Sequence, residues 1–207
     1  MNIKTAIDWA LLKNKLREAL LTLPHFLKNP IEGMKNLPQW GWAETLILQA
    51  SFAAICGVLK SLVERQFLSA IFSVILYPLS CLLLTSIFTG LFYYAFYFFF
   101  KREVSFHRLY INILFAGIPI LITSTVTYFL PPISLIGVIT AAILLYVGFI
   151  EEFRLPKDKV KKILGAIVFV YLLMWVYQLI QFTQRQETFR LQALPESMEI
   201  LEKDFKN

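Results

Sequence analysis

The chain lacks charge over three long stretches. Asp, Glu, Lys and Arg are absent from the 35 residues 66–100, the 42 residues 109–150 and the 22 residues 163–184. About 20 apolar residues suffice for a helix to cross a hydrocarbon core of roughly 30 Å. The composition, 57% hydrophobic and 16% charged, is also too apolar for an ordinary soluble domain. The sequence therefore predicts an integral membrane protein with one compact membrane domain.

Residues that carry chemistry are also few. Cys56 and Cys81 lie inside apolar stretches, so they indicate neither a disulfide framework nor a zinc site. His25 and His107 have no metal-ligand spacing and no nucleophile motif beside them, and a glycine-rich phosphate loop is missing. No ionisable residue lies at the centre of an expected span, where pumps and membrane enzymes place such groups. We therefore expect no enzyme activity, no cofactor and no metal.

The sequence predicts five transmembrane helices, four of them inside these uncharged stretches and the first before them. The first is extended by snorkelling of Lys60, and the second is over-long, with Pro78 as the expected kink. The tandem prolines 131 and 132 divide the next stretch into a helical hairpin. The fold is thus expected to be all-α, with a membrane domain over 43–183 and spans at 43–62, 68–100, 109–130, 133–150 and 163–183.

The N-terminal segment 1–42 is expected to stay outside the membrane core. Between Thr5 and Leu27 apolar residues recur at near helical spacing, while Lys13, Lys15 and Arg17 add positive charge. This pattern predicts an amphipathic helix that lies flat in the headgroup region or packs on the ends of the spans. Its charges interrupt the continuous apolar core that a secretory signal requires.

Basic residues are distributed unequally between the two sides that five spans create. Fourteen Lys and Arg lie in the N-terminal segment, the loop at Lys101 and the linker 154–162, which share one side, and six lie in the loop at Lys60 and the polar tail 184–207. Since cytoplasmic loops carry the excess of Lys and Arg, we expect a cytoplasmic N-terminus and a tail on the opposite side. Topology and anionic lipid also explain the net charge of +6, without nucleic acid as a partner.

Candidate contact residues lie at helix breaks and at the membrane boundary. In the third span, Gly117 and Pro119 either open the helix and expose backbone carbonyls or let another helix approach closely. Ala53, Ala54 and Gly57 support either a homo-oligomer or packing within one protomer. The cations expected to contact anionic lipid headgroups are Lys13, Lys15, Arg17, Lys101, Arg102 and Arg108.

The order of these parts resembles the Yip domain family, the Ypt/Rab-interacting polytopic membrane proteins and their bacterial relatives. The residues that carry the resemblance are the proline-containing segment 23–30 and the entry to the third span, 106–119, with Ala116 and Gly117 before Pro119. The family implies five spans and a cytoplasmic N-terminus. Eukaryotic members have a long N-terminal region with an Asp-Leu-Tyr-Gly-Pro type motif, which this chain lacks. The resemblance therefore implies a bacterial-type member in the inner membrane, and Rab GTPase binding is not carried over.

Two functions are compatible with these features. The first is a non-enzymatic protein that organises or assembles membrane components through its cytoplasmic face, with a membrane-protein partner or a second copy as its contact. The alternative is a permease or lipid-moving protein, in which Pro78 and the 117–119 break frame a hydrophilic path. The candidate lining residues are Thr123, Ser124, Thr125 and Thr127, although these four hydroxyls cannot all share one helical face.

Overall fold

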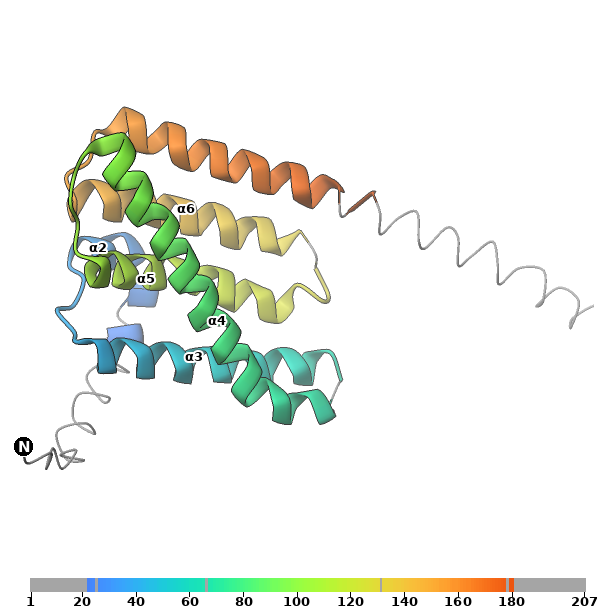
Figure 1. Ribbon diagram of the computed structural model, residues 1–207. Coiled ribbons are helices and arrows are strands. Elements are labelled where there is room, and N and C mark those ends of the chain that lie inside the picture. The colour runs from blue at the N-terminus through green and yellow to red at the C-terminus, as the bar shows by residue number, and fades with distance from the viewer. Residues whose placement is uncertain (1–21, 25, 66, 131, 178, 181–207) are drawn as a thin grey trace, which may run out of the picture. The chain divides into compact units, whose positions relative to one another are not determined.

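The computed structural model describes residues 22–24, 26–65, 67–130, 132–177 and 179–180 (Figure 1). Within these residues the regular elements are all helical, which confirms the all-α prediction. Five of the helices are long and apolar enough to cross a membrane. Lys13, Lys15, Arg17 and most of the expected amphipathic helix lie outside the described residues, as does the tail 184–207.

The described helices follow one another with short connections. The chain divides into two compact units, Met1–Leu164 and Gly165–Asn207, and the second unit begins inside the last helix. The helices are α2 (Pro30–Lys35), α3 (Trp42–Val63), α4 (Phe67–Ala95) with its π-helical end η1 (Phe96–Phe100), α5 (Phe106–Val126), α6 (Ile133–Glu151) and the membrane-length helix Lys157–Tyr177.

The last helix begins earlier than its expected span at residue 163. Lys157 is its first residue, so the cations that the sequence places in a linker occupy the first turns of the helix. Pro156 directly precedes it, a position where the fixed φ of proline suits a helix start. Val160 and Leu164, one turn apart, are buried and anchor these turns in the first unit.

α3 and α4 approach closely at Gly57. A Cβ at this position would lie 2.9 Å from both Cβ and Cγ of Tyr77 on α4. Ala53, one turn earlier, is fully buried. Ser61 and Ser73 share a hydrogen bond of 2.7 Å between the same helices. Ala53 and Gly57 therefore take part in packing within one protomer, one of the two roles that the sequence left open.

α5 and α6 pack antiparallel in a constant register. Thr123 lies against Gly137. Eleven residues toward the start of α5 and toward the end of α6, Asn112 lies against Gly148. Four residues beyond that, Arg108 pairs with Glu152. Because glycine has no side chain, Gly137 and Gly148 let the two backbones approach without displacing Thr123 or Asn112.

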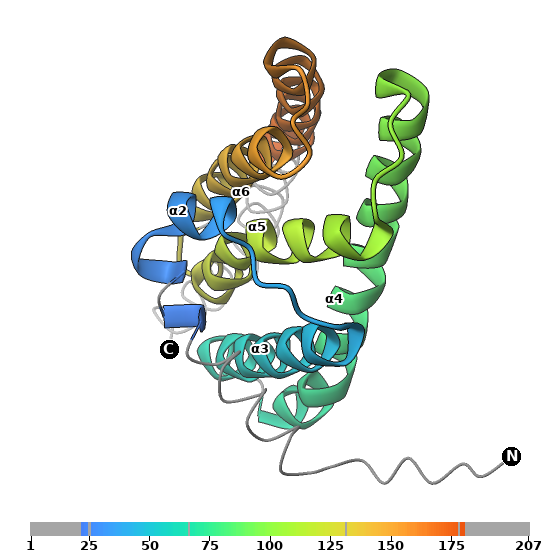
Figure 2. The same cartoon turned by 90° about the vertical axis from the view of Figure 1, so that its left-hand side faces the viewer.

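Two apolar cores hold the first unit together. The first lies under α2, which packs against α5 and α6 (Figure 2). There the ring of Phe26 meets that of Phe115 with centroids 5.0 Å apart, and Met34 is fully buried. The second joins η1, α6 and the start of the last helix around Phe96 and Phe149, whose centroids are 4.9 Å apart. Segments distant in sequence are thus fixed at one end of the helices.

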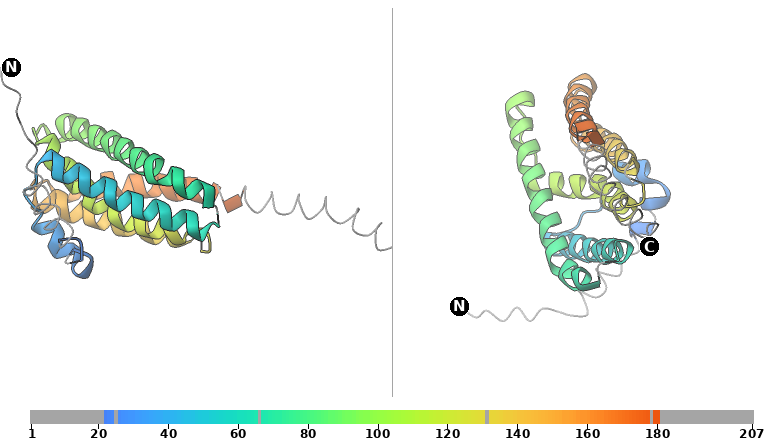
Figure 3. Two further views of the ribbon diagram at one scale, coloured as in Figure 1. Left: turned by 90° about the horizontal axis from the view of Figure 1, so that it is seen from below. Right: turned by 90° about the vertical axis from the view of Figure 1, so that its right-hand side faces the viewer.

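α4 lies at the margin of the first unit, packed on α3 and α5 (Figure 3). Only 6% of its most apolar stretch of 18 residues is buried inside the protein, and residues such as Ile71 and Ile75 are exposed. A surface this apolar requires lipid around it, because water would penalise its exposure. The helix continues through Pro78, whose ring is buried, and ends in the widened turn η1.

Candidate functional site

Arg108 joins three segments at the loop-rich end of the first unit, on the left in Figure 1. Its Nε donates to Glu152 Oε1 at 2.7 Å, its Nη1 donates to the carbonyl of Pro38 at 3.1 Å, and its Nη2 completes the ion pair with Glu152. The two side chains are only 26% and 21% exposed. The connector before α3, the start of α5 and the end of α6 are therefore held together by one guanidinium.

Arg102 makes a second link at the same end. Its Nη1 donates to the carbonyls of Phe153 at 3.0 Å and Arg154 at 3.3 Å. Arg154 has a left-handed φ of 49° in the turn between α6 and the last helix. A backbone turn of that kind costs free energy in a non-glycine residue, and the bonds from Arg102 help to hold it. The structure thus places Arg102 and Arg108 in contacts with the protein itself.

Lys101 differs from these two arginines. It ends η1 with a φ of 51°, and its backbone N–H donates to the carbonyl of Phe96. Its side chain is exposed, and within the described part of the chain it takes part in no ion pair. Of the three described cations that the sequence predicts as headgroup contacts, Lys101 is the one whose charged group stays available.

His107 belongs to an aromatic group at the start of α5. The Trp42 ring lies 4.4 Å from the His107 ring and 5.4 Å from the Tyr110 ring, between centroids. Thr45 Oγ1 and His107 Nε2 are 3.5 Å apart. These contacts fix α3 against α5 at the boundary where Trp and Tyr side chains favour the headgroup region.

Gln49 links three helices one turn deeper in the first unit. Tyr110 on α5 donates its hydroxyl proton to Gln49 Oε1, and Gln49 Nε2 donates to Thr85 Oγ1 at 2.7 Å and to the Cys81 carbonyl at 3.2 Å on α4. Gln49 and Tyr110 are buried. Bonds of this kind have no water to compete with inside a bilayer, so they fix the arrangement of α3, α4 and α5. Tyr110 was not singled out by the sequence, because nothing in an apolar run shows which tyrosine faces inward.

Asn112 is the exception among the buried polar residues. It is fully buried, and neither Oδ1 nor Nδ2 has a hydrogen-bond partner in the described structure. Its amide lies against the backbone of Gly148, and the terminal methyl group of Met34 on α2 lies beside the same glycine. A buried amide without a partner carries a desolvation cost of about 1–3 kcal/mol.

The expected break in the third span stays helical. α5 runs through Gly117 and Pro119, and a Cβ at Gly117 would meet no described atom within 4 Å, so no other helix among the described residues approaches closely there. The four hydroxyls beyond it each donate to a backbone carbonyl of their own helix: Thr123 to Pro119, Ser124 to Leu121, Thr125 to Ile122 and Thr127 to Thr123. Ser124 Oγ also lies 2.9 Å from Tyr77 Oη on α4.

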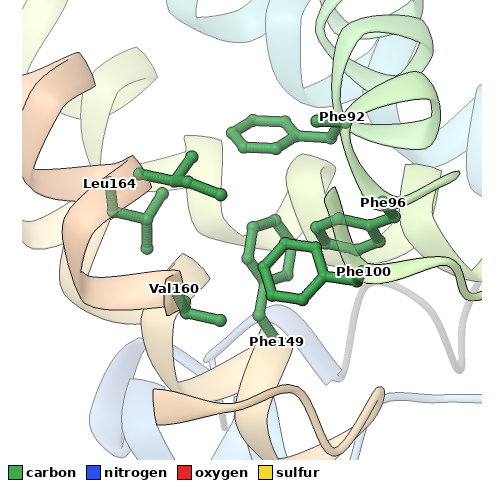
Figure 4. A pocket seen from close by; sticks show the side chains of 8 residues that line it. Phe92, Phe96, Phe100, Phe149, Val160 and Leu164 are labelled. Carbon is green, nitrogen blue, oxygen red and sulfur yellow. The ribbon is translucent and has the colours of Figure 1, made fainter. Parts of the chain in front are cut away.

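A small, partly open space lies inside the second core. Figure 4 shows Phe92, Phe96 and Phe100 turned toward Phe149, with Val160 and Leu164 on the other side. Its volume of about 10 Å³ is at the lower limit for a single water, and its lining is apolar. This space is a packing feature. In the described residues no group of three or more His, Cys, Asp or Glu is placed to hold a metal ion.

The five membrane-length helices define a polytopic α-helical integral membrane protein. The profile of the Yip1 domain matches residues 25–179, and the chain belongs to this family. The match confirms the resemblance carried by the residues themselves. Neither the curated proteins nor the solved structures contain a match to the chain. The Yip1 family is in general not an enzyme family, which together with the spans supports a non-enzymatic membrane protein.

Proposed function

We propose that the protein organises or assembles other membrane components through the loop-rich end of its first unit, and that this end faces the cytoplasm of a bacterial cell. The observation that carries the proposal is that the cations at this end fall into two groups, those bonded to the protein and those exposed. Arg102 and Arg108 bind protein groups and hold the loops in place. Among the exposed basic side chains at this end are those of Lys101, Lys157, Lys159, Lys161 and Lys162.

The exposed lysines suit either anionic headgroups or an acidic surface on a partner. Lys159 Nζ lies 5.9 Å from the centre of the Phe100 ring, and the other four lysines take part in no ion pair with described residues. A basic group near the membrane surface gains about 1 kcal/mol from anionic lipid. Fourteen of the twenty Lys and Arg lie in the segments expected on this side, which supports the cytoplasmic orientation.

The experiment compares two charge-neutralised variants. The first carries Lys157→Gln, Lys159→Gln, Lys161→Gln and Lys162→Gln, and the control carries Lys60→Gln and Arg65→Gln from the opposite end. Each full-length protein is extracted gently from its native membrane, and co-purifying proteins and lipids are quantified by mass spectrometry. We expect a stoichiometric membrane-protein partner that wild type and control retain and that the four-lysine variant loses.

Two results would contradict the proposal. One is a wild-type protein that brings down no stoichiometric partner. The other is a partner that the four-lysine variant retains in full. A specific lipid or small molecule that co-purifies without any protein would instead favour transport, which a flux assay in liposomes then tests against empty vesicles.

A further inference from the structure

An open hollow lies where the chain leaves the end of η1. Its volume is about 370 Å³, and it is lined by Tyr97, Phe98, Lys101 and Glu103. Tyr97 is 55% exposed and Phe98 70% exposed. Sites for small molecules begin at about 300 Å³, so the hollow has room for a polar headgroup rather than a single ion.

The hollow lies at the level of the lipid headgroups. Lys101 is the first charged residue after the 35 uncharged residues 66–100, and the residues before it form an aromatic belt. Such belts mark the boundary between hydrocarbon and water. In that position, we expect the two aromatic side chains to face acyl chains and glycerol, and Lys101 and Glu103 to face the polar layer.

Two opposite charges from one short loop line this hollow. Residues 101–105 form no helix after the left-handed Lys101. Lys101 and Glu103 both line the hollow, whereas Arg102, which lies between them in sequence, does not. The hydrogen bonds from Arg102 to the carbonyls of Phe153 and Arg154 hold its guanidinium at the turn after α6.

Lys101 and Glu103 do not form an ion pair with each other in the described structure. In the part of the chain that the structure describes, neither Lys101 nor Glu103 takes part in an ion pair, although both line one hollow. A ligand with a negative and a positive group would satisfy both. A purely anionic headgroup would gain from Lys101 and lose to Glu103 by like-charge repulsion.

We propose that this hollow binds a zwitterionic phospholipid whose headgroup carries a phosphate and a primary ammonium, as in phosphatidylethanolamine. The phosphate accepts hydrogen bonds from Lys101 Nζ, the ammonium donates to the carboxylate of Glu103, and the acyl chains lie along Tyr97 and Phe98. A quaternary ammonium such as that of phosphatidylcholine has no N–H to donate to Glu103 and binds less tightly. The site deepens the proposed function by naming a lipid class for the same end of the protein. It rests on that function for the contact role of this end, but it needs no protein partner.

The test is lipid competition on the purified full-length protein. Phosphatidylethanolamine, phosphatidylcholine and phosphatidylglycerol with identical acyl chains are added in equal amounts, and bound lipids are counted by native mass spectrometry. We expect wild type to prefer phosphatidylethanolamine. Glu103→Gln should lose about tenfold in that binding, the size of one charge-assisted hydrogen bond, and should gain phosphatidylglycerol. Lys101→Gln should weaken all three lipids.

Lys60→Gln and Glu64→Gln, from the ion pair at the opposite end, are the matched controls and should leave the preference unchanged. Wild type that prefers phosphatidylglycerol, a Glu103→Gln variant with unaltered preference, or a protein that retains none of the three lipids overturns the proposal. Since the partner experiment above leaves Glu103 unchanged, failure of the lipid site and failure of the assembly function give different results.

Discussion

Arg108 in the first turn of α5 and Glu152 at the end of α6 form an ion pair that closes the α5–α6 hairpin opposite its proline turn. Each residue alone would sit at the wrong end of its helix, because the N-terminus of a helix favours negative charge and the C-terminus positive charge. The pair removes both penalties at once. It also holds the Pro38 carbonyl, so the connector before α3 depends on the same contact.

Arg108→Ala should therefore destabilise the protein by roughly 1–3 kcal/mol, between the values for exposed and for buried pairs. Thermal unfolding in detergent, followed by tryptophan fluorescence, measures the loss. The control is Lys60→Ala, which removes a 4.0 Å pair with Glu64 on a more exposed surface and should cost less than about 0.5 kcal/mol. Equal melting temperatures for the two variants would show that the Arg108 contact does not hold the loops.

Gln49→Leu should loosen α3 from α4 and α5. The substitution removes the bonds to Thr85 and the Cys81 carbonyl and leaves the buried Tyr110 hydroxyl without its acceptor. Polar bonds between membrane helices contribute about 0.6–2 kcal/mol each, so we expect a lower melting temperature. Ser80→Ala, which loses only a bond to its own helix on an exposed face, is the control and should be nearly neutral. A Gln49 variant as stable as the Ser80 variant would contradict the interhelical role.

Two glycine substitutions should have opposite effects. Gly57→Ala places a methyl group 2.9 Å from the Tyr77 side-chain stem, which cannot move without its helix, so about 1–3 kcal/mol is lost to overpacking. Gly117→Ala meets open space and should gain about 0.5–1 kcal/mol from the better helix propensity of alanine. Melting temperatures in the same detergent compare the two. Destabilisation by Gly117→Ala would mean that another helix, from a partner or a second copy, packs there.

Asn112→Leu should stabilise the protein. Leucine has a shape close to that of asparagine, and it replaces an amide whose two polar atoms have no partner in the described structure. Removal of that desolvation cost should gain about 1–2 kcal/mol. The variant is compared with wild type by thermal unfolding, with Asn112→Ala as the control for the cavity that a smaller side chain leaves. A marked loss of stability in Asn112→Leu would instead show that the amide binds something in the native membrane.

Local features predicted the elements of this fold well. Five charge-free or nearly charge-free stretches were sufficient to predict five membrane helices, because charge inside a bilayer is costly wherever it falls in the sequence. The polar side chains inside these helices bond to protein groups, Gln49 to Thr85 on α4 and Thr123 to the Pro119 carbonyl of its own helix. The start of the last helix at Lys157 was missed, since exposed lysines in a first turn look the same as lysines in a linker.

The roles of individual cations were beyond the reach of the sequence. Lys101, Arg102 and Arg108 are close neighbours with similar chemistry, and all three were predicted to contact lipid. Only the fold brings Glu152 and the carbonyls of Pro38, Phe153 and Arg154 within reach of the two arginines.

The sequence by itself determined that this chain is a membrane protein of the Yip1 family with five helical spans, since apolar length and the order of segments are local properties. The tertiary structure decided which polar side chains are consumed in holding the helices together and which stay exposed. That distinction depends on contacts between residues as far apart as Pro38 and Arg108, and hydrophobic patterning along a chain carries no information about such pairs.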